Sequence, residues 1–377
     1  GRKLLIYAKK IIEKVYHNKI VDTKYGKVKC NAECVYGDSV TSDTPLLLRN
    51  KKTGLIEIKI ISELSDLWNP YEGFKNSEKG RRNKQQSKCE NYEIYSSSGW
   101  CNIKRVIRHK TIKKIYRVKT KNSVVDVTED HSLLDNNLLP IKPKSVKSST
   151  VLFHKYPKKK NLFTFFKIIR KEFILYRSYD EIKGFVMGYI LECGYYNNNS
   201  FGLFVVERHD ATIIKKLILK LFEFDGILLV YNETLKLYKL EFTKRILNYF
   251  RKIYSHKNYR NYVSNYYLNC NNKNMLAYMS GYMFGKEQNI EKEDKKSINK
   301  EKYSALYYIA SCLNLENYFE NMLSDKVNKY SCYGRNKNCS VKFKRKSYDN
   351  EFVYDIETET GNFNCGFPLI VKNTDSC

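Results

Sequence analysis

This 377-residue chain contains no N-terminal signal peptide and no apolar run of the roughly 18 residues that a membrane-spanning helix needs. These absences predict a soluble, intracellular protein that is not secreted and makes no membrane contact. The chain also lacks an initial Met and begins Gly-Arg-Lys, so we expect it to be an excerpt of a longer protein.

Acidic residues are scarce beside basic ones. The chain has 40 Asp and Glu residues against 68 Lys and Arg residues, which gives a formal net charge of +28. Such an excess favours a polyanionic partner, most simply nucleic acid. The same excess would arise without any partner in the product of an AT-rich genome, since Lys, Asn, Tyr and Ile are frequent throughout. Both interpretations stand at this point.

Clustered metal ligands are also missing. The 11 cysteines are scattered, and no second pair or nearby His completes the neighbours Cys30 and Cys34 into a tetrahedral site. We therefore expect neither a metal site of this kind nor a disulfide framework, and we expect a reducing compartment. Hydrophobic residues make up 42% of the chain and aromatic residues 14%, which suffices for the buried cores of two or three domains.

Periodicity divides the chain into a β segment, an α/β segment and a second β segment. Apolar residues at helical spacing predict a helix in residues 1–18, and a strand follows over 28–36. Short apolar stretches then predict the strands 44–48, 55–61, 92–95, 112–120 and 124–127. Helical spacing predicts helices at 163–176, 182–191, 211–224, 243–254, 275–284 and 303–322, and β character returns from 340 to 371. This order predicts one domain inserted into another.

Two short polar segments read as one motif when they are joined. Tyr36-Gly37-Asp38 followed by Thr374-Asp375-Ser376 gives Tyr-Gly-Asp-Thr-Asp-Ser, which resembles the metal-binding motif of family-B DNA polymerases. Residues 1–34 resemble the palm helix and strand that precede this motif. Two Asp residues on one hairpin can hold the two Mg²⁺ ions of phosphoryl transfer. The resemblance implies that Asp38 and Asp375 bind Mg²⁺ only after the intervening segment has been removed.

The intervening segment, residues 39–373, resembles inteins inserted at this site in the polymerases of large DNA viruses. The resemblance implies a mainly β splicing domain of the horseshoe-like HINT fold, with an inserted α/β domain of the LAGLIDADG endonuclease type and a short α/β polymerase palm flank. The implied boundaries are an N-extein at 1–38, splicing-domain parts at 39–158 and 328–373, an endonuclease-like domain at 159–327 and a C-extein at 374–377.

The resemblance assigns the first chemical step to Ser39, Thr128 and His131. Ser39 begins the insert, and its hydroxyl would attack the preceding carbonyl and convert the Asp38–Ser39 amide into an ester. The block from Val127 to His131 resembles the intein block that carries Thr-x-x-His. His131 would protonate the leaving nitrogen, and Thr128 would orient the amide and stabilise developing negative charge.

The later steps fall to residues near the C-terminal junction. Asp355, within Val-Tyr-Asp-Ile-Glu, would act as a base towards Thr374 or tune ester formation. Thr374 would receive the N-terminal segment on its hydroxyl. Asn373 would then attack its own carbonyl through its side-chain nitrogen and form a succinimide, and an O-to-N shift would restore an amide. The resemblance implies no cofactor for splicing, because proximity supplies the rate.

Lys372 departs from the intein pattern, in which a His usually precedes the terminal Asn. A lysine ammonium can donate a hydrogen bond to the Asn373 carbonyl but cannot shuttle protons as an imidazole does. None of the six His residues lies beyond residue 256. We therefore hypothesise that Asn373 cyclises slowly, with Asp355 or a distant His assisting, and that branched or N-terminally cleaved intermediates accumulate.

Two segments of the α/β region, 184–194 and 276–286, resemble LAGLIDADG helices. In nucleases of that family the two helices cross with small residues in contact, and each helix ends in an acidic residue that binds Mg²⁺. Gly188 and Gly281 lack a Cβ and would permit such a crossing.

The expected metal positions do not carry acidic residues. Aligned on the two glycines, they fall on Cys193 and Lys286, and Lys286 would repel a cation. Glu192 and Glu287 are one residue away, which rotates a side chain by about 100° on a helix. The resemblance therefore implies a degenerate homing endonuclease that keeps its fold; any remaining cleavage would need Mg²⁺.

Two other classes of function remain open. A domain of the same β fold could only cleave itself, as in hedgehog-like proteins, or the chain could be a site-specific DNA-binding endonuclease that its β segments scaffold. The divided polymerase motif and the Asn373–Thr374 pair favour splicing. In that case we expect a monomer in the host cytoplasm, the nucleus or a viral factory, with double-stranded DNA as its partner.

Overall fold

The computed structural model describes most of the chain. The described residues are 20–23, 26–29, 39–71, 84–120, 122–157, 168–197, 200–222, 226–246, 248, 262–288, 299–316, 339–346 and 351–373. The hairpin of β1 (Ile20–Thr23) and β2 (Gly26–Lys29) is the described part of the expected polymerase flank. The helix expected at 1–18 lies outside the described residues, and so do Asp38, Thr374 and Asp375.

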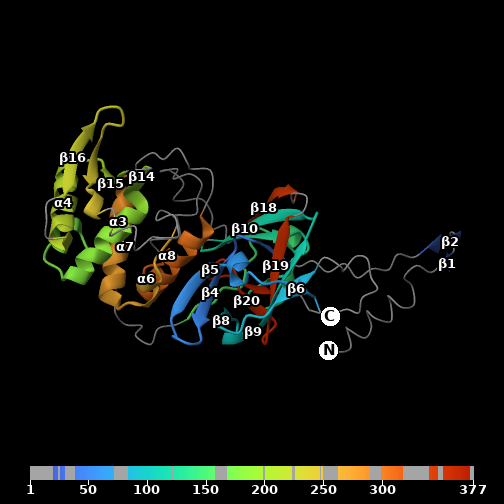
Figure 1. The fold of residues 1–377 in the computed structure, drawn as a ribbon. Coiled ribbons are helices and arrows are strands. Elements are labelled where there is room, and N and C mark those ends of the chain that lie inside the picture. Colours follow the sequence, from blue (N-terminus) through green and yellow to red (C-terminus); the bar gives the residue numbers. More distant parts are fainter. Residues whose placement is uncertain are drawn as a thin grey trace.

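A long antiparallel sheet forms the β part of the molecule (Figure 1). Nine of its strands follow the order β18-β10-β11-β3-β19-β9-β8-β4-β5, so strands far apart in the chain are neighbours. Beside this path, β7 (Gln85–Ser87) pairs with β9, and β6 (Asn69–Pro70) pairs with β7. Their bounds are β3 Val40–Thr41, β4 Pro45–Asn50, β5 Ile56–Ile60, β8 Tyr92–Ser96, β9 Gly99–Lys110, β10 Lys114–Thr120, β11 Val124–Thr128, β18 Cys339–Lys346 and β19 Phe352–Thr358. The five strands expected between 44 and 127 are confirmed as β4, β5, β8, β10 and β11. The mainly β character expected of this part is therefore confirmed as well.

The two-residue strand β3 lies between β11 and β19. Val40 pairs with Val127 on one side and with Tyr354 on the other. Around this point the core is apolar, and Leu46 and Ile356 are completely buried in it. Burial of such side chains is the main stabilising contribution to a sheet of this kind. The sheet thereby holds the start of the insert between strands from its N-terminal and C-terminal parts.

A second, smaller sheet carries the C-terminal end of the described chain. Its order is β13-β12-β21-β20, with bounds β12 Leu133–Leu134, β13 Pro140–Ile141, β20 Asn362–Asn364 and β21 Ile370–Lys372. Leu133 pairs with Val371. The chain just after β11 and the chain just before Asn373 are consequently neighbours.

The part of the chain between β13 and β18 is helical with one small sheet (Figure 1). Helices α3 (Tyr179–Cys193) and α7 (Asn272–Glu287) pack against each other, and α4 (Arg208–Phe222) covers the four-stranded sheet β14-β15-β17-β16. The other bounds are α2 Lys171–Ile174, β14 Gly194–Asn197, β15 Ser200–Val205, β16 Ile227–Asn232, β17 Leu237–Phe242, α6 Asn265–Asn269 and α8 Lys300–Cys312. No described helix combines the length and apolar character that crossing a membrane requires.

The helical region shares a core with the β part. The aromatic ring of Phe367, which is 1% exposed, contacts the rings of Tyr307 and Tyr308 on α8. Asn269 of α6 extends the edge strand β5, because its side chain accepts from the Ile56 amide and donates to the Ile56 carbonyl, both at 2.8 Å. One hydrophobic cluster accordingly includes residues of both regions.

Candidate active site

Ser39 is held by its backbone against Thr128. The Ser39 N–H donates to Thr128 Oγ1 (3.1 Å), and the Thr128 N–H donates to the Ser39 carbonyl (2.9 Å). Ser39 is 1% exposed, and its Oγ has no hydrogen-bond partner among the described residues. The Ser39 nitrogen belongs to the Asp38–Ser39 peptide bond, so Thr128 contacts the amide that the first splicing step would break.

The turn at the end of β11 leaves two side chains buried. Thr128 and His131 are completely buried, and the His131 N–H donates to the Thr128 carbonyl (3.0 Å) to close a turn. The two residues between them face outward, where Glu129 pairs with Lys144 at 2.8 Å and Asp130 pairs with Lys113. The Thr-x-x-His spacing therefore delivers a hydroxyl and an imidazole to the same interior.

Asn373 directly follows β21 and is held against the turn that follows β19. Its backbone N–H donates to the Gly361 carbonyl (3.1 Å), and Asn373 is 1% exposed. With its amide oriented by hydrogen bonding, Nδ2 donates to the same carbonyl (2.6 Å) and Oδ1 accepts from the Thr358 N–H (3.2 Å). Gly361 has a φ of +77°, a conformation that favours glycine. In this arrangement Nδ2 must leave Gly361 before it can attack the Asn373 carbonyl.

One short segment, residues 128–132, contacts both ends of the insert. Thr128 holds Ser39, and four residues later the Ser132 carbonyl accepts from the Lys372 N–H (3.1 Å). His131 lies between these two contacts, so its position in the chain is next to both junctions. Ser39 and Asn373 are thus linked through a single turn of backbone.

Asp355 and Lys372 have different surroundings. Asp355 is 3% exposed and lies on β19, next to Tyr354, which pairs with Val40 beside Ser39. Lys372 is the half-buried last residue of β21. Sequence reasoning found both, but it missed the Thr358 and Gly361 backbone groups that hold Asn373. Backbone partners leave no mark in a sequence except the glycine that the turn needs.

The two glycines expected at a helix crossing do lie at one. A Cβ on Gly188 would be 1.9 Å from the Tyr278 carbonyl oxygen, and a Cβ on Gly281 would be 1.9 Å from the Phe185 carbonyl oxygen. These positions admit hydrogen alone, because α3 and α7 touch through their backbones.

The C-terminal ends of α3 and α7 carry no pair of open carboxylates. Glu192 is bound by Lys302, whose Nζ lies 3.0 Å from Glu192 Oε2. Cys193 is buried, and its thiol donates to the Gly285 carbonyl (3.3 Å). Lys286 and Glu287 are exposed. Across the described residues, no group of three or more His, Cys, Asp or Glu side chains is placed to hold a metal ion.

Taken together, the β sheets and this site resemble a self-processing domain in which two distant junctions meet. In an alignment 409 positions long that covers all of the chain, it is 35% identical to a protein named DNA polymerase from Acanthamoeba polyphaga mimivirus. A protein named DNA polymerase from Thermococcus hydrothermalis is 34% identical over 116 residues, or 29% of the chain and 6% of that protein. The chain spans 22% of the length of the mimivirus relative. No family model matches it.

Solved inteins are similar only at low scores. A mini-intein of transcription factor IIB (Mvu) aligns with 89% of the chain and all of its own, at 12% identity and a TM-score of 0.30. An intein from a hyperthermophile aligns with 89% of the chain and 98% of its own, at 11% identity and a TM-score of 0.28. The match to the mimivirus polymerase along the whole chain, the divided motif, and the contacts of residues 128–132 with both Ser39 and Lys372 are consistent with an intein in a DNA polymerase.

Proposed function

We propose that residues 39–373 excise themselves by protein splicing and join Asp38 to Thr374. The observation that carries the proposal is the contact of residues 128–132 with both ends of the insert. Splicing needs both junctions within reach of one another, because an acyl group passes directly from one to the other. Reacting groups held in this way gain rate from proximity.

In the first step, Ser39 Oγ attacks the Asp38 carbonyl carbon. A C–O bond forms, the C–N bond to Ser39 breaks, and the proton of the hydroxyl ends on the Ser39 nitrogen. Thr128 Oγ1 accepts from the Ser39 N–H and fixes the orientation of the amide as it loses planarity. His131, which is completely buried and bonds the Thr128 carbonyl through its backbone N–H, delivers the proton to the leaving nitrogen.

The second and third steps move the bond to Thr374 and release the insert. The Thr374 oxygen attacks the ester carbon and the bond from that carbon to the Ser39 oxygen breaks. Asp355 takes the proton of the Thr374 hydroxyl and returns it to the Ser39 oxygen, which regenerates the Ser39 hydroxyl. Asn373 Nδ2 then attacks the Asn373 carbonyl carbon, and the Thr374 nitrogen leaves with the proton. Lys372 donates to the carbonyl oxygen during this step. The ester at Thr374 finally rearranges to an amide, and no cofactor takes part.

Intact-mass analysis of the chain expressed in a heterologous cell tests this proposal. We expect a fragment spanning 39–373 that is lighter by one water than the free acid, because it ends in a succinimide, and a peptide joining 1–38 to 374–377. Since no His precedes Asn373, a time course should also show branched or N-terminally cleaved intermediates. Recovery of full-length precursor alone, after long incubation of folded protein, would refute splicing.

The joined product would restore Tyr-Gly-Asp-Thr-Asp-Ser. We propose that Asp38 and Asp375 then share one hairpin and bind the Mg²⁺ ions of a family-B DNA-directed DNA polymerase. The support is the sequence motif and the match to polymerases. Before splicing, the two Asp residues belong to separate segments, so the precursor is expected to lack polymerase activity.

We propose further that the helical region is a LAGLIDADG-type endonuclease domain that no longer cleaves. The close crossing at Gly188 and Gly281 supports the family, and the ion pair of Glu192 with Lys302 supports the loss of activity. The ammonium group of Lys302 competes with Mg²⁺ for the carboxylate of Glu192. The metal does not fit the described residues at this helix crossing.

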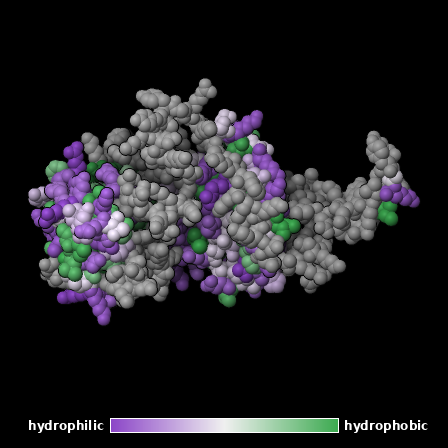
Figure 2. Space-filling view, turned by 90° about the horizontal axis from the view of Figure 1, so that it is seen from above, coloured by the Kyte–Doolittle hydropathy of each residue, from purple (hydrophilic) through white to green (hydrophobic). Residues whose placement is uncertain are grey.

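The exposed face of the small sheet β14-β15-β17-β16 bears on DNA binding. The described face of the small sheet is not a row of basic side chains; the exposed residues on β16 and its turn include Leu228, Tyr231 and Leu235, which are 64%, 51% and 53% exposed. Figure 2 likewise shows apolar and hydrophilic side chains intermingled on the described part of this region. We propose double-stranded DNA as a partner bound through net charge, with the protein a monomer inside the host cell or viral factory.

A nicking assay tests the loss of cleavage. A supercoiled plasmid carrying the uninterrupted motif sequence is expected to remain intact with the protein and Mg²⁺. Glu192→Gln, which removes the carboxylate, should give the same result as the wild type. Cleavage that requires both Mg²⁺ and Glu192 would show that Lys302 yields its place to the metal. A gel-shift titration at two salt concentrations measures DNA binding independently.

A further inference from the structure

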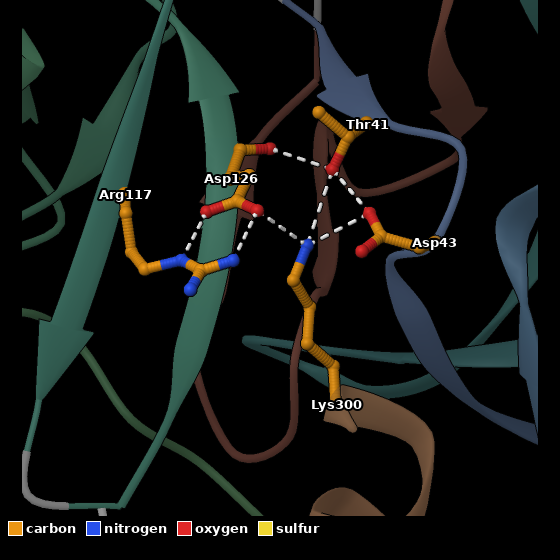
Figure 3. A network of polar contacts seen from close by, with 5 residues as sticks. All are labelled: Thr41, Asp43, Arg117, Asp126 and Lys300. Atoms are coloured by element: carbon orange, nitrogen blue, oxygen red, sulfur yellow. Dashed lines mark hydrogen bonds and ion pairs between the residues drawn. The ribbon is translucent and has the colours of Figure 1, made fainter. Parts of the chain in front are cut away.

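Lys300 reaches from the helical region into the interior of the β part (Figure 3). It is the first residue of α8 and is 4% exposed. Its Nζ lies 2.9 Å from Asp126 Oδ2, 2.8 Å from Asp43 Oδ1 and 3.2 Å from Thr41 Oγ1. All three donor positions of the ammonium therefore face groups of β3, its turn and β11.

The charges around Lys300 balance. Asp126 is completely buried and also receives Arg117 at both carboxylate oxygens, with Nε at 2.8 Å and Nη2 at 2.9 Å. The network thus contains two carboxylates and two cations. Desolvation alone would raise the pKa of Asp43, but the charge and hydrogen bond of Lys300 outweigh it and lower that pKa. The ionised form of Asp43 is therefore favoured where it meets the ammonium.

The residues that Lys300 binds flank the contact between Ser39 and Thr128. Thr41 lies two residues after Ser39, and Asp126 lies two residues before Thr128. Between them, Val40 pairs with Val127. Because β3 has only two residues, few backbone bonds fix its position. The ammonium ties the hydroxyl of Thr41 to the carboxylate of Asp126 and so ties β3 to β11 at the place where the scissile amide is held.

We propose that Lys300 is a positioning residue for ester formation at Ser39, which makes the inserted helical region a working part of the splicing site. This inference rests on the proposed splicing function. Its effect should be specific to the first step. Asp126 keeps Arg117 when Lys300 is lost, and the side chain of Asp43 is 56% exposed and can be hydrated. What disappears is the ammonium bridge between Thr41 and Asp126, which leaves the longer hydrogen bond from Thr41 Oγ1 to the Asp126 carbonyl (3.4 Å). The hydrogen bonds of Asn373 to Thr358 and Gly361 are untouched.

Two inactivated backgrounds separate the steps. In Asn373→Ala, release of residues 1–38 by hydroxylamine reports the ester; in Ser39→Ala, loss of residues 374–377 reports Asn373 cyclisation. In the full chain, Lys300→Met is expected to slow ester formation by about tenfold or more and to change cyclisation by less than about twofold. Lys302→Met is the matched control: it lies on the same helix and pairs with Glu192 inside the helical region, and it should change neither rate.

A second variant guards against a folding defect. Thr41→Val removes the bridging hydroxyl but keeps the ion pairs of Lys300, so it should slow the same step, and the double variant should be no slower than Lys300→Met alone. Equal slowing of both steps, additive effects, or no effect of Lys300→Met would overturn the proposal. Absence of ester and cyclisation products from chains with an intact Lys300 would instead refute splicing itself.

Discussion

Ser39→Ala is expected to abolish the joined peptide and to leave only cleavage after Asn373. The variant lacks the hydroxyl proposed to open the Asp38–Ser39 amide, and the methyl group fits the buried space that Oγ occupies. Loss of a nucleophile reduces a reaction of this kind by on the order of a thousandfold or more. Asn373 keeps its contacts to Gly361 and Thr358, so its cyclisation continues.

Asn373→Ala should give the opposite pattern. The ester at Ser39 and its transfer to Thr374 remain possible, but no succinimide forms. Branched chains and free residues 1–38 are then expected, and no fragment ending at residue 373. Intact-mass analysis after matched incubation times distinguishes the two patterns. Joined peptide from either variant would contradict the mechanism, and identical products from both would favour a protein that only cleaves itself.

The second large effect concerns the helix crossing. Gly281→Ala places a Cβ 1.9 Å from the Phe185 carbonyl oxygen, a separation that the backbones cannot keep. The helices must move apart along a tightly packed interface, at an expected cost of about 3 kcal/mol or more in the free energy of unfolding. Because α3 and α7 are mostly buried along their length, a shift at one point disturbs the packing of both.

Gly184→Ala is a graded control for this experiment. Gly184 lies on α3, the other helix of the crossing, but a Cβ there would be 3.0 Å from the Asn274 carbonyl oxygen, so a shift of a few tenths of an ångström relieves it. Its cost should be clearly smaller. Urea unfolding in the doubly inactivated Ser39→Ala, Asn373→Ala background keeps the chain intact during the measurement. Equal stability of the Gly281→Ala and Gly184→Ala variants would show that the crossing is looser than described.

Sequence analysis predicted the strands in which apolar residues are dense and missed a strand in which charged residues interrupt them. Strand β9 was not expected, because Lys104, Arg105 and Arg108 interrupt its pattern. These side chains are retained on the strand by specific partners: Arg105 pairs with Glu357 at 2.5 Å, and Arg108 stacks on Trp68. Pairing of this type depends on distant residues, which a local pattern does not contain.

Sequence analysis proposed the site residues that stand in motifs, but it did not find Lys300. Ser39, Thr128, His131 and Asn373 stand in motifs whose spacing is itself chemical information. Lys300, by contrast, lies in the basic stretch Lys-Ser-Ile-Asn-Lys-Glu-Lys, where nothing separates a buried lysine from its exposed neighbours. Its importance arises from the fold, which brings α8 to β3 and β11 across long stretches of chain.

The ring of Phe367 bears on how this chain can evolve. A descendant that shed the helical region in one deletion would uncover a large aromatic side chain on the β part, beside the C-terminal junction. An uncovered ring of this size invites self-association. Stepwise deletions that retain α8 until a smaller side chain has replaced Phe367 would avoid exposing this ring. The present architecture therefore favours loss of the outlying helices and small sheet before loss of α8.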